Sequence, residues 1–448
     1  MLTVRYRDRR ATFDPITLAF EADDGLARAH VRAETPAPRP ADETPVAAPR
    51  RPVLERLVLN VANYCNLDCV YCYAGGGGYG RPPRRMSIET ARHALLRVWD
   101  EHGQIPAIQF FGGEPLLNWR TIEGACRAAA HIADTRSSPL PAFLVVTNGT
   151  IMSDRVLGML KTHRIQVTAS LDGPPEISDR LRPSRGGGGA SSLVERNVRM
   201  LHDLLGQPGQ IEATYTRLHL ESKCSVWDVV EYVWERFGVC SVHVPMNALP
   251  PEAGRSETQA LHADHVQEVA DYYSDAVARS IRAIATRPVG TFAALRSAVD
   301  ILTELVFPRR LPPRYACPAG SGTLAVDVDG MIYPCFMFYG QSAYQIGNTR
   351  SANLLDEVAR ARLLERIELA SDGVEQTSWA SRFVSRCVGA DFLRQGRDDE
   401  ALPDDPVVTA MVSAAIVELA WLKRDDPERF YFLPNALSLY RRYLGVEP

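Results

Sequence analysis

Three cysteines lie within eight residues, at Cys65, Cys69 and Cys72, directly after an apolar run that is expected to form a strand. Thiolates at this spacing on one loop can hold a cubane iron–sulfur cluster and leave one iron without a protein ligand. A structural zinc site normally takes four protein ligands, so three cysteines without a nearby fourth favour iron–sulfur over zinc. The open iron can then bind a small chelating ligand through an amino group and a carboxylate.

A pair of glycines and a glutamate end the second apolar run, in the segment Phe111-Gly112-Gly113-Glu114-Pro115. Two glycines let the backbone approach a ligand closely, and Glu114 offers a carboxylate for an ammonium group. A plain turn is the alternative interpretation.

Two further expected strands end in small polar residues, Thr147-Asn148-Gly149 and Ser170-Leu171-Asp172-Gly173. Serine and aspartate supply the donors and acceptors that a ribose needs. Taken alone, each segment is more typical of a turn that ends a strand. Right-handed crossovers bring the carboxyl ends of parallel strands to one face, where we expect the site.

Together these segments resemble the radical S-adenosylmethionine superfamily. The spacing Cys-x3-Cys-x2-Cys, with the aromatic Tyr71 before the last cysteine, is similar to the motif of that family. The resemblance implies a four-iron, four-sulfur cluster and S-adenosylmethionine as cofactors. It also implies one-electron cleavage of the sulfonium to a 5′-deoxyadenosyl radical, which abstracts a hydrogen atom from an unactivated carbon.

The resemblance assigns roles to the polar segments. The Gly-Gly-Glu segment would contact the amino group of the methionine moiety, and the residues at the third and fourth strand ends would line the cofactor. Tyr71 would lie beside the adenine, with simple packing as the alternative. The implied cofactor-binding residues are Tyr71, Gly112, Gly113, Glu114, Thr147, Asn148, Ser170 and Asp172.

A second set of cysteines follows about 250 residues later. Cys317 and Cys335, with Gly330 between them, resemble the opening of the SPASM or twitch extension of peptide maturases, which binds an auxiliary cluster. An expected hairpin over Thr323–Tyr333 would place the two thiols side by side. Two buried thiols or a zinc hairpin are the alternatives.

The next segment departs from the family pattern. In the register of the expected cysteines, Ser378 and Ser381 replace the first two, Cys387 keeps the third and Asp391 replaces the fourth. We therefore expect one auxiliary cluster, held by Cys317, Cys335 and Cys387, with Asp391 or an open site as the fourth position.

The substrate class follows from the same resemblance. Phe336 stands directly after the cysteine where sulfatase maturases carry an acidic base, which counts against that activity. The segments Thr214–Arg217, Val244-Pro245 and Leu324–Val326 look most like maturases that install thioether or carbon–carbon crosslinks. We expect a ribosomally synthesised precursor peptide or protein as substrate and flavodoxin or ferredoxin as electron donor; the resemblance assigns no residue as the catalytic base. Alternatives are a catalytically silent peptide-binding relative, a radical oxidoreductase of a small molecule, and a sulfatase-maturase-like enzyme.

The elements that position these residues alternate along the chain. Strands are expected at Leu57–Ala62, Ala107–Phe111, Phe143–Thr147, Gln166–Leu171, Gln210–Thr216 and Ser241–Met246. Helices are expected between them, at Ser87–His102, Trp119–Ala133, Ser153–Thr162, Ser191–Leu205 and Val226–Phe237. This alternation predicts an α/β fold, a partial (β/α)6 TIM-like barrel with a C-terminal SPASM-like iron–sulfur extension.

Three domains are expected. Residues 1–53 comprise a two-stranded ribbon and a Pro/Ala-rich linker, residues 54–307 the partial barrel, and residues 308–448 the auxiliary cluster segment and C-terminal helices. The glycine runs at 75–78 and 186–189 are interpreted as flexible loops.

The composition of the 448 residues is that of an ordinary folded protein, with a net charge of −4 that gives no argument for nucleic acid or an anionic membrane. The charged N-terminus predicts no signal peptide, and the longest apolar run, Ala410–Leu422, is expected to be too short to cross a bilayer. We therefore expect a cytoplasmic protein. There, cysteines are ligands or core residues rather than disulfides, and Cys126, Cys224 and Cys240 are interpreted as ordinary thiols.

Overall fold

The computed structural model describes residues 1–24, 53–247, 259–307, 315, 317–368, 379–380, 383–384, 387–394 and 404–444. The expected linker at residues 33–52 and the positions of Ser378 and Ser381 lie outside these ranges.

Ten strands form one sheet in the order β10-β9-β8-β7-β6-β5-β4-β11-β12-β13. Neighbours from β10 to β11 are parallel, whereas β12 and β13 are antiparallel additions. The strands are β4 (Arg56–Ala62), β5 (Ala107–Gly112), β6 (Ala142–Thr147), β7 (Gln166–Ser170), β8 (Gln210–Glu212), β9 (Ser241–His243), β10 (Ala294–Leu295), β11 (Thr323–Val326), β12 (Met331–Tyr333) and β13 (Gly347–Asn348).

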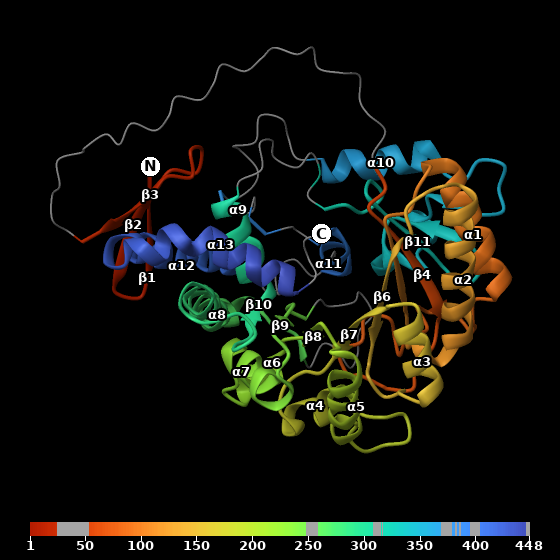
Figure 1. Ribbon diagram of the computed structural model, residues 1–448, viewed down its shortest axis with the longest axis horizontal. Helices are drawn as coiled ribbons and strands as arrows, with labels where there is room; N and C mark the ends of the chain where they lie inside the picture. Colours follow the sequence, from red (N-terminus) through yellow and green to blue (C-terminus); the bar gives the residue numbers. More distant parts are fainter. Residues whose placement is uncertain are drawn as a thin grey trace, which may run out of the picture.

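Helices connect the parallel strands and cover the outer side of the curved sheet, so the partial barrel is confirmed (Figure 1). They are α1 (Ile88–His102), α2 (Trp119–Thr135), α3 (Asp154–Thr162), α4 (Pro175–Leu181), α5 (Ser191–Leu205), α6 (Arg217–Glu221), α7 (Val226–Phe237), α8 (Val266–Thr286) and α9 (Arg296–Val306). The five expected helices are confirmed; α4 and α6 are short additions in loops after β7 and β8. Local signals set the bounds: α1 begins after the N-cap Ser87 and ends at Gly103 in the left-handed conformation.

The strands are buried on the side that faces the helices. Leu57, Leu59, Ile108 and Phe110 are fully buried in a core shared with α1 and α2. This burial fixes the register of the parallel strands, because a shift by one residue would expose the whole apolar face. The opposite face of the sheet encloses the lumen of the barrel.

The N-terminal segment forms three strands, not the expected two. They are β1 (Leu2–Tyr6), β2 (Arg9–Phe13) and β3 (Phe20–Asp23). The expected two-stranded ribbon has one strand too few because the turn at residues 7–8 joins β1 to β2, and a second turn at residues 14–19 brings β3 back to pair with β2. Val4, Tyr6, Ala11 and Phe13 join the core that contains α8 and α12, so this sheet packs on the C-terminal helices.

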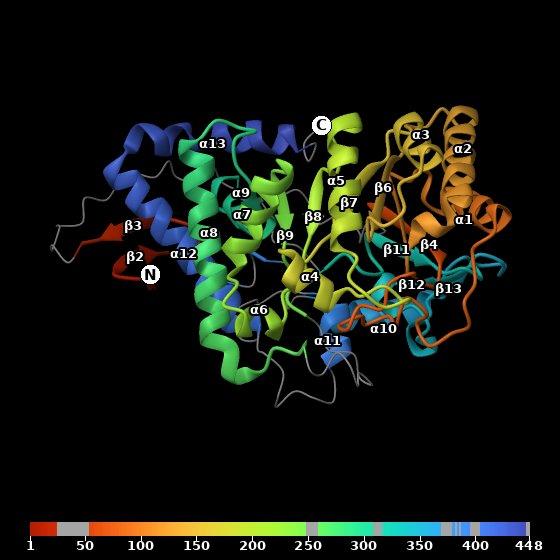
Figure 2. The same ribbon diagram turned by 90° about the horizontal axis from the view of Figure 1, so that it is seen from below.

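The C-terminal helices are α10 (Glu357–Ile367), α11 (Val388–Arg394), α12 (Asp404–Asp425) and α13 (Pro427–Tyr443). In Figure 2, α11 and α13 lie toward opposite ends of the barrel strands, and α12 lies beside α8. Segments far apart in sequence thus close the open side of the barrel.

One helix within the described ranges, Pro406–Asp425, is long and apolar enough to cross a membrane by length and composition. The expectation that this apolar run is too short was therefore wrong, because the helix extends past Ala410 and Leu422. Its burial inside the fold explains the composition: 61% of the apolar window is buried. Its buried Glu418 accepts two hydrogen bonds from Arg282 of α8, at 2.5 and 2.8 Å.

Candidate active site

The cysteine loop, residues 63–86, is fixed to the strand beside it by backbone hydrogen bonds. The amide of Gly113 donates to the carbonyl oxygen of Ala62 (2.8 Å), and the amide of Glu114 donates to that of Tyr64 (3.0 Å). The loop therefore starts where β4 and β5 both end, at the carboxyl edge of the sheet.

The glycine run at residues 75–78 lies within this loop and packs against its start, at Cys65, and against the end of β5. A Cβ at Gly77 would lie 2.4 Å from the Cα of Gly113 and 3.2 Å from the Cβ of Cys65. Gly77 also has a φ of +83°, a region that side chains other than glycine rarely adopt. The expectation of a flexible loop was therefore wrong here, since only glycine lets this backbone approach the cysteine loop.

The surroundings of the thiols fit an iron–sulfur cluster. The Sγ of Cys65 accepts hydrogen bonds from the backbone amide of Leu67 and from the side-chain amide of Asn148, both at 3.4 Å. Hydrogen bonds to sulfur are among the contacts that tune such clusters. Burial raises the pKa of Cys69 to about 12 and raises that of Cys65, so bound iron is needed to stabilise these thiolates.

The spacing of the ligands does not fit a single ion. Within the described ranges, no group of three or more His, Cys, Asp or Glu could hold one metal ion.

Glu114 lies elsewhere than expected. Its carboxylate is fully buried and accepts hydrogen bonds from the amide of Leu116 (2.9 Å), the hydroxyl of Thr147 (2.8 Å) and the amide of Asn148 (2.7 Å). Burial raises its pKa to about 7, against the effect of these hydrogen bonds. Glu114 thus ties the end of β5 to the end of β6, and its carboxylate does not face the cavity as the proposed ammonium contact requires.

The carboxylate of Asp172 is also hydrogen-bonded to protein groups and does not line the cavity. Its fully buried carboxylate accepts hydrogen bonds from the hydroxyl of Tyr71 (2.7 Å) and the amide of Thr214 (3.0 Å). Arg182 donates to the hydroxyl of Tyr71 (2.6 Å) and lies 3.7 Å from Asp172. Burial raises the pKa of Tyr71, which therefore remains a neutral donor. The sequence pattern gave no signal for Arg182.

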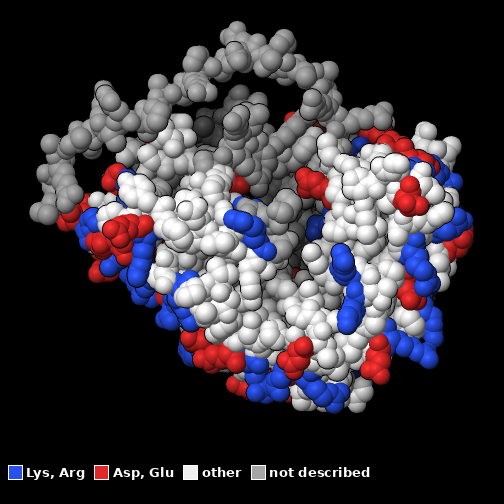
Figure 3. Space-filling model, in the orientation of Figure 1, with Lys and Arg blue, Asp and Glu red and all other residues white. Residues whose placement is uncertain are grey.

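The other expected cofactor residues line one large cavity. Its volume is about 1530 Å³, and its wall includes Gly112, Gly113, Thr147, Asn148, Ser170 and Tyr71, together with the three cysteines of the loop. The face drawn in Figure 3 is hollowed near its centre. Of the eleven predicted positions, which are the three cysteines and the eight cofactor residues, nine therefore line the same space; Glu114 and Asp172 lie behind its wall.

The wall of this cavity is polar below the cysteine loop as well. Side chains from neighbouring strands face into it, among them Gln109, Thr168, Glu212 and His243. Gln109 is 7% exposed, and its Oε1 has no hydrogen-bond partner within the described part of the chain. A buried acceptor without a partner costs free energy, so a bound donor group is expected to satisfy it.

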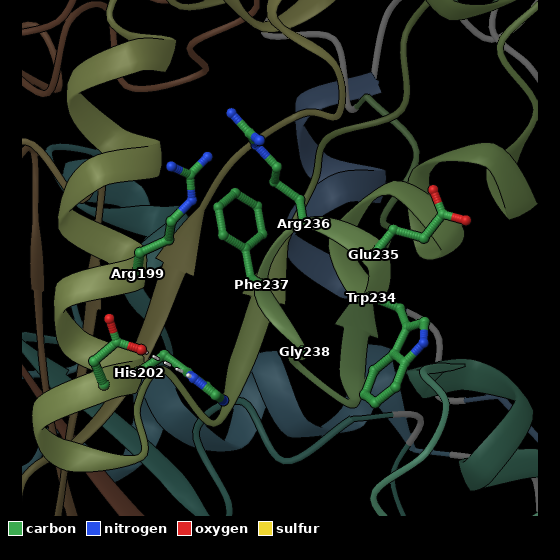
Figure 4. A pocket seen from close by; sticks show the side chains of 8 residues that line it. Arg199, His202, Trp234, Glu235, Arg236, Phe237 and Gly238 are labelled. Atoms are coloured by element: carbon green, nitrogen blue, oxygen red, sulfur yellow. Dashed lines mark ion pairs between the residues drawn. The ribbon is translucent and has the colours of Figure 1, made fainter.

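A second hollow, of about 420 Å³, lies on the outside of the barrel between α5 and α7 (Figure 4). Its wall includes Arg199 and Arg236, and both guanidinium groups pair with the buried carboxylate of Glu195, at 3.1 and 2.7 Å. These charges are satisfied within the wall. The hollow contains none of the residues that the sequence assigned to a site.

The C-terminal cysteines lie near one another in the fold. Burial raises the pKa of Cys335, and the nearby thiols of Cys387 and Cys317 raise it further. Cys335 and Cys387 each accept a hydrogen bond from a backbone amide, that of Met337 and that of Ala390, both at 3.4 Å. This is the same kind of contact that Cys65 makes. Cys317 and Cys387 therefore both lie close enough to Cys335 to affect its pKa.

Phe336 forms part of the cavity wall between the two groups of cysteines. Its ring lies 4.2 Å from the ring of Phe111, between ring centres, and both rings face the cavity. Cys387 and Asp391 line the same cavity. The carboxyl end of the barrel and the C-terminal segment thus enclose one space.

Comparison with known proteins agrees with this geometry. Residues 59–233, from β4 to α7, match the model of the Radical SAM superfamily. This part of the chain is a radical SAM domain. Such a domain works with a four-iron, four-sulfur cluster and S-adenosylmethionine, and the thiols and the polar cavity described above fit both groups.

Among curated relatives, the protein MJ0907 of Methanocaldococcus jannaschii is 36% identical over 134 residues, which cover 30% of this chain and 44% of that protein. The chain spans less than half the length of the first curated relatives that it matches.

Two groups of solved structures share the fold. The complex of anSMEcpe with AdoMet and the Cp18Cys peptide aligns with a TM-score of 0.63 and 18% identity, over 86% of this chain and 99% of that one. Streptococcus suis SuiB bound to S-adenosylmethionine aligns with a TM-score of 0.53 and 14% identity, over 79% and 77%. At these identities the comparison establishes the fold of the radical SAM domain and of the segments that follow it.

Proposed function

We propose that this protein is a radical S-adenosylmethionine enzyme that forms a crosslink in a ribosomally synthesised peptide. The observation that carries the proposal is the single cavity of about 1530 Å³, which is lined by the cysteine loop, by Phe336 and by Cys387. A cavity that joins a radical-generating site to a second group of thiols suits a reaction that removes two hydrogen atoms from one substrate.

The residues of the site would bind the cluster and the cofactor. Cys65, Cys69 and Cys72 would hold the cluster that binds the cofactor. The backbones of Gly112 and Gly113 line the cavity and would lie against the methionine moiety. Glycine is needed at both positions because a Cβ would meet the backbone of Ala62 or Tyr64, where the cysteine loop begins. When bound, S-adenosylmethionine supplies the 5′-deoxyadenosyl radical that abstracts a hydrogen atom from the substrate.

Polar residues at the next strand ends would orient the cofactor. Thr147, Asn148 and Ser170 line the cavity. The hydroxyl of Thr147 already donates to Glu114 and the side-chain amide of Asn148 to Cys65, which fixes both side chains at the cavity wall. The hydroxyl of Tyr71 already donates to Asp172, so its ring, which lines the cavity, is the part that would lie beside the adenine. Asp172 and Glu114 would act through the residues that they hold in place.

The auxiliary cluster would be held by Cys317, Cys335 and Cys387. Asp391 lies one helical turn after Cys387 and would supply the fourth position, unless that iron stays open to the substrate. The cluster would accept the electron that the substrate loses when the new bond forms.

The size of the cavity supports a peptide substrate. Pockets for small ligands usually enclose roughly 300–1,000 Å³, so this cavity has room for S-adenosylmethionine and for a segment of polypeptide beside it. The structures of anSMEcpe with a peptide and of SuiB, which share this fold, support the same substrate class. We propose a reducing, cytoplasmic setting with flavodoxin or ferredoxin as the electron donor; all nine cysteines are free.

A sulfatase-maturase-like activity is the second candidate. It is favoured by the alignment with anSMEcpe, which extends over 99% of that chain. Phe336 counts against it, because an aromatic ring that packs on Phe111 cannot accept the proton that such an oxidation releases.

Anaerobic reconstitution with iron and sulfide, followed by dithionite and S-adenosylmethionine, tests the proposal. We expect formation of 5′-deoxyadenosine, and we expect co-expression with candidate precursor peptides, taken from any short open reading frame found near the gene, to yield a peptide that has lost two hydrogen atoms per crosslink. Tandem mass spectrometry would locate the new bond. A reconstituted protein that forms no 5′-deoxyadenosine would refute the proposed radical S-adenosylmethionine activity. An aldehyde product in a sulfatase peptide would favour the second candidate.

A further inference from the structure

A carboxylate and an imidazole lie side by side in the lumen, outside the residues that hold the cofactors. Glu212 is on β8 and His243 on β9, and these two residues are direct partners in the parallel pairing of the strands. The Nδ1 of His243 lies 3.4 Å from the Oε2 of Glu212. Both side chains line the large cavity and keep part of their surface open to it, 42% for His243 and 34% for Glu212.

The pair lies at the level of the expected cofactor site. In the register of the sheet, Glu212 is the partner of Ser170, so Ser170, Glu212 and His243 form one row across three adjacent strands. Neighbouring strands are about 4.8 Å apart, which puts the pair within two strand spacings of the expected ribose contact. Thr214, two residues beyond Glu212 on the same strand side, also lines the cavity.

Few other groups in the described part of the cavity wall can accept a proton. Asp391 is the one other carboxylate there, and it lies on α11 beside the thiol of Cys387. His202 lies at the other mouth of the cavity, where it also borders the outer hollow. The remaining charged or titratable side chains of the wall are cationic or phenolic, apart from the cysteines: Arg56, Arg182, Arg296, Arg442, Tyr71, Tyr73, Tyr79, Tyr273 and Tyr443.

Crosslink formation requires such an acceptor. When a carbon–sulfur or carbon–carbon bond replaces one C–H and one X–H bond, the substrate loses two hydrogen atoms. One leaves as a hydrogen atom and becomes part of 5′-deoxyadenosine. The other leaves as a proton and an electron, and Phe336 stands where the related sulfatase maturases carry an acidic residue.

We propose that the Glu212–His243 pair is the proton acceptor of this reaction. The inference rests on the proposed function and names the group that completes it. As the new C–X bond forms and the X–H bond breaks, the proton passes to the pair and one electron passes to an oxidised iron–sulfur cluster. His243 then shares the proton with Glu212 until solvent in the cavity removes it.

The variants Glu212→Gln and His243→Asn test the role, because each removes the basic group and keeps a similar volume. The probe is the precursor peptide found by the co-expression experiment above, purified and added to reconstituted protein with dithionite and S-adenosylmethionine. Gln210→Ala is the matched control, since Gln210 lines the cavity on the same strand and carries no titratable group. Iron per chain, peptide affinity and melting temperature are measured for each variant.

We expect Glu212→Gln to form 5′-deoxyadenosine at the parental rate while the crosslink formed per 5′-deoxyadenosine falls about 100-fold, within the range of general base catalysis. Freeze-quenched samples should show a substrate-centred radical by electron paramagnetic resonance. Formate added to Glu212→Ala should restore part of the coupling, which a purely structural role would not allow. The control should keep the parental ratio.

An unchanged ratio in Glu212→Gln, with iron content and peptide affinity intact, would overturn the inference. So would a loss of 5′-deoxyadenosine formation equal to the loss of crosslink, because the pair would then act in cofactor binding. If Glu212→Gln does not fold, the His243→Asn variant and the formate experiment show whether the pair accepts the proton. A parental protein that forms no 5′-deoxyadenosine would refute the proposed function itself, which is a separate result.

Discussion

The close approach of Gly77 to the cysteine loop predicts a large effect for a single methyl group. In Gly77→Ala the new Cβ would meet the Cα of Gly113 at 2.4 Å and two atoms of Cys65 at 3.2 Å. Backbone atoms cannot yield as the end of a flexible side chain can. The cysteine loop or the end of β5 must therefore move.

Gly75→Ala is a matched control in the same loop. Gly75 also has a positive φ, of 55°, but a Cβ there would meet no atom within 4 Å. The left-handed conformation costs a residue other than glycine about 1–2 kcal/mol, and this cost is common to both variants. Overpacking adds about 1–3 kcal/mol in Gly77→Ala alone, so we expect losses of about 1–2 and about 2–5 kcal/mol respectively.

Two assays separate the contributions. Urea unfolding of the cluster-free proteins compares their stability, and iron per chain after reconstitution reports the integrity of the cysteine loop. We expect Gly75→Ala to keep the parental iron content and Gly77→Ala to lose the iron of the first cluster. Equal losses of stability and of iron in the two variants would refute the steric reasoning.

Three further predictions concern buried polar groups and thiols. The pKa of Glu114 is raised from 4.5 to about 7, so its contribution to stability is complete below pH 4.5 and is lost as the pH rises through 7. The loss amounts to about 3 kcal/mol, and urea titrations of Glu114→Gln across this range should lack it. Tyr71→Phe removes the hydroxyl that bonds Asp172 and should cost about 1–3 kcal/mol, measured by the same titrations; an unchanged stability would show that the hydroxyl is dispensable. Cys335→Ala and Cys387→Ala should each lower iron per chain and still allow 5′-deoxyadenosine formation, whereas parental iron content in both would exclude an auxiliary cluster.

The part of the fold that repeats along the chain was predictable from local patterns. Buried strands such as β4 and β5 are continuous apolar runs, and helices such as α1 begin and end at capping residues that the sequence shows directly. The N-terminal strands were harder, because a hairpin and a longer turn fit the same residues. The pairing of β11 with β4 joins residues more than 260 positions apart, and no local pattern indicates it.

The candidate site was predictable in position but not in detail. Polar residues at the ends of parallel strands meet at one edge of the sheet, so Asn148 and Ser170 line the same cavity as the cysteine loop. Which oxygen atoms face the cavity depends on distant partners. Glu114 is turned away by Thr147 and Asn148, and the partners of Asp172 include an arginine that no motif marks.

The same long-range pairing predicts that the barrel segment does not fold alone. β11 pairs in parallel with β4, and its Leu324 and Val326 are fully buried in the core of the barrel. Removing residues 308–448 exposes this edge and the surface that α12 covers on α8. Each fully buried aliphatic side chain contributes about 1.5–3 kcal/mol, so a handful of them equals the whole stability of a typical domain.

We therefore expect residues 54–307, expressed alone, to be insoluble or to lack a cooperative thermal transition by circular dichroism. Co-expression with residues 308–448 should restore a soluble complex that binds iron, because β11 and α12 can then pair in trans. A fragment of residues 54–307 that unfolds cooperatively would show that the C-terminal segment is a separate domain attached to a finished barrel. In that case the cavity shared by Phe111 and Phe336 would be an interface between domains.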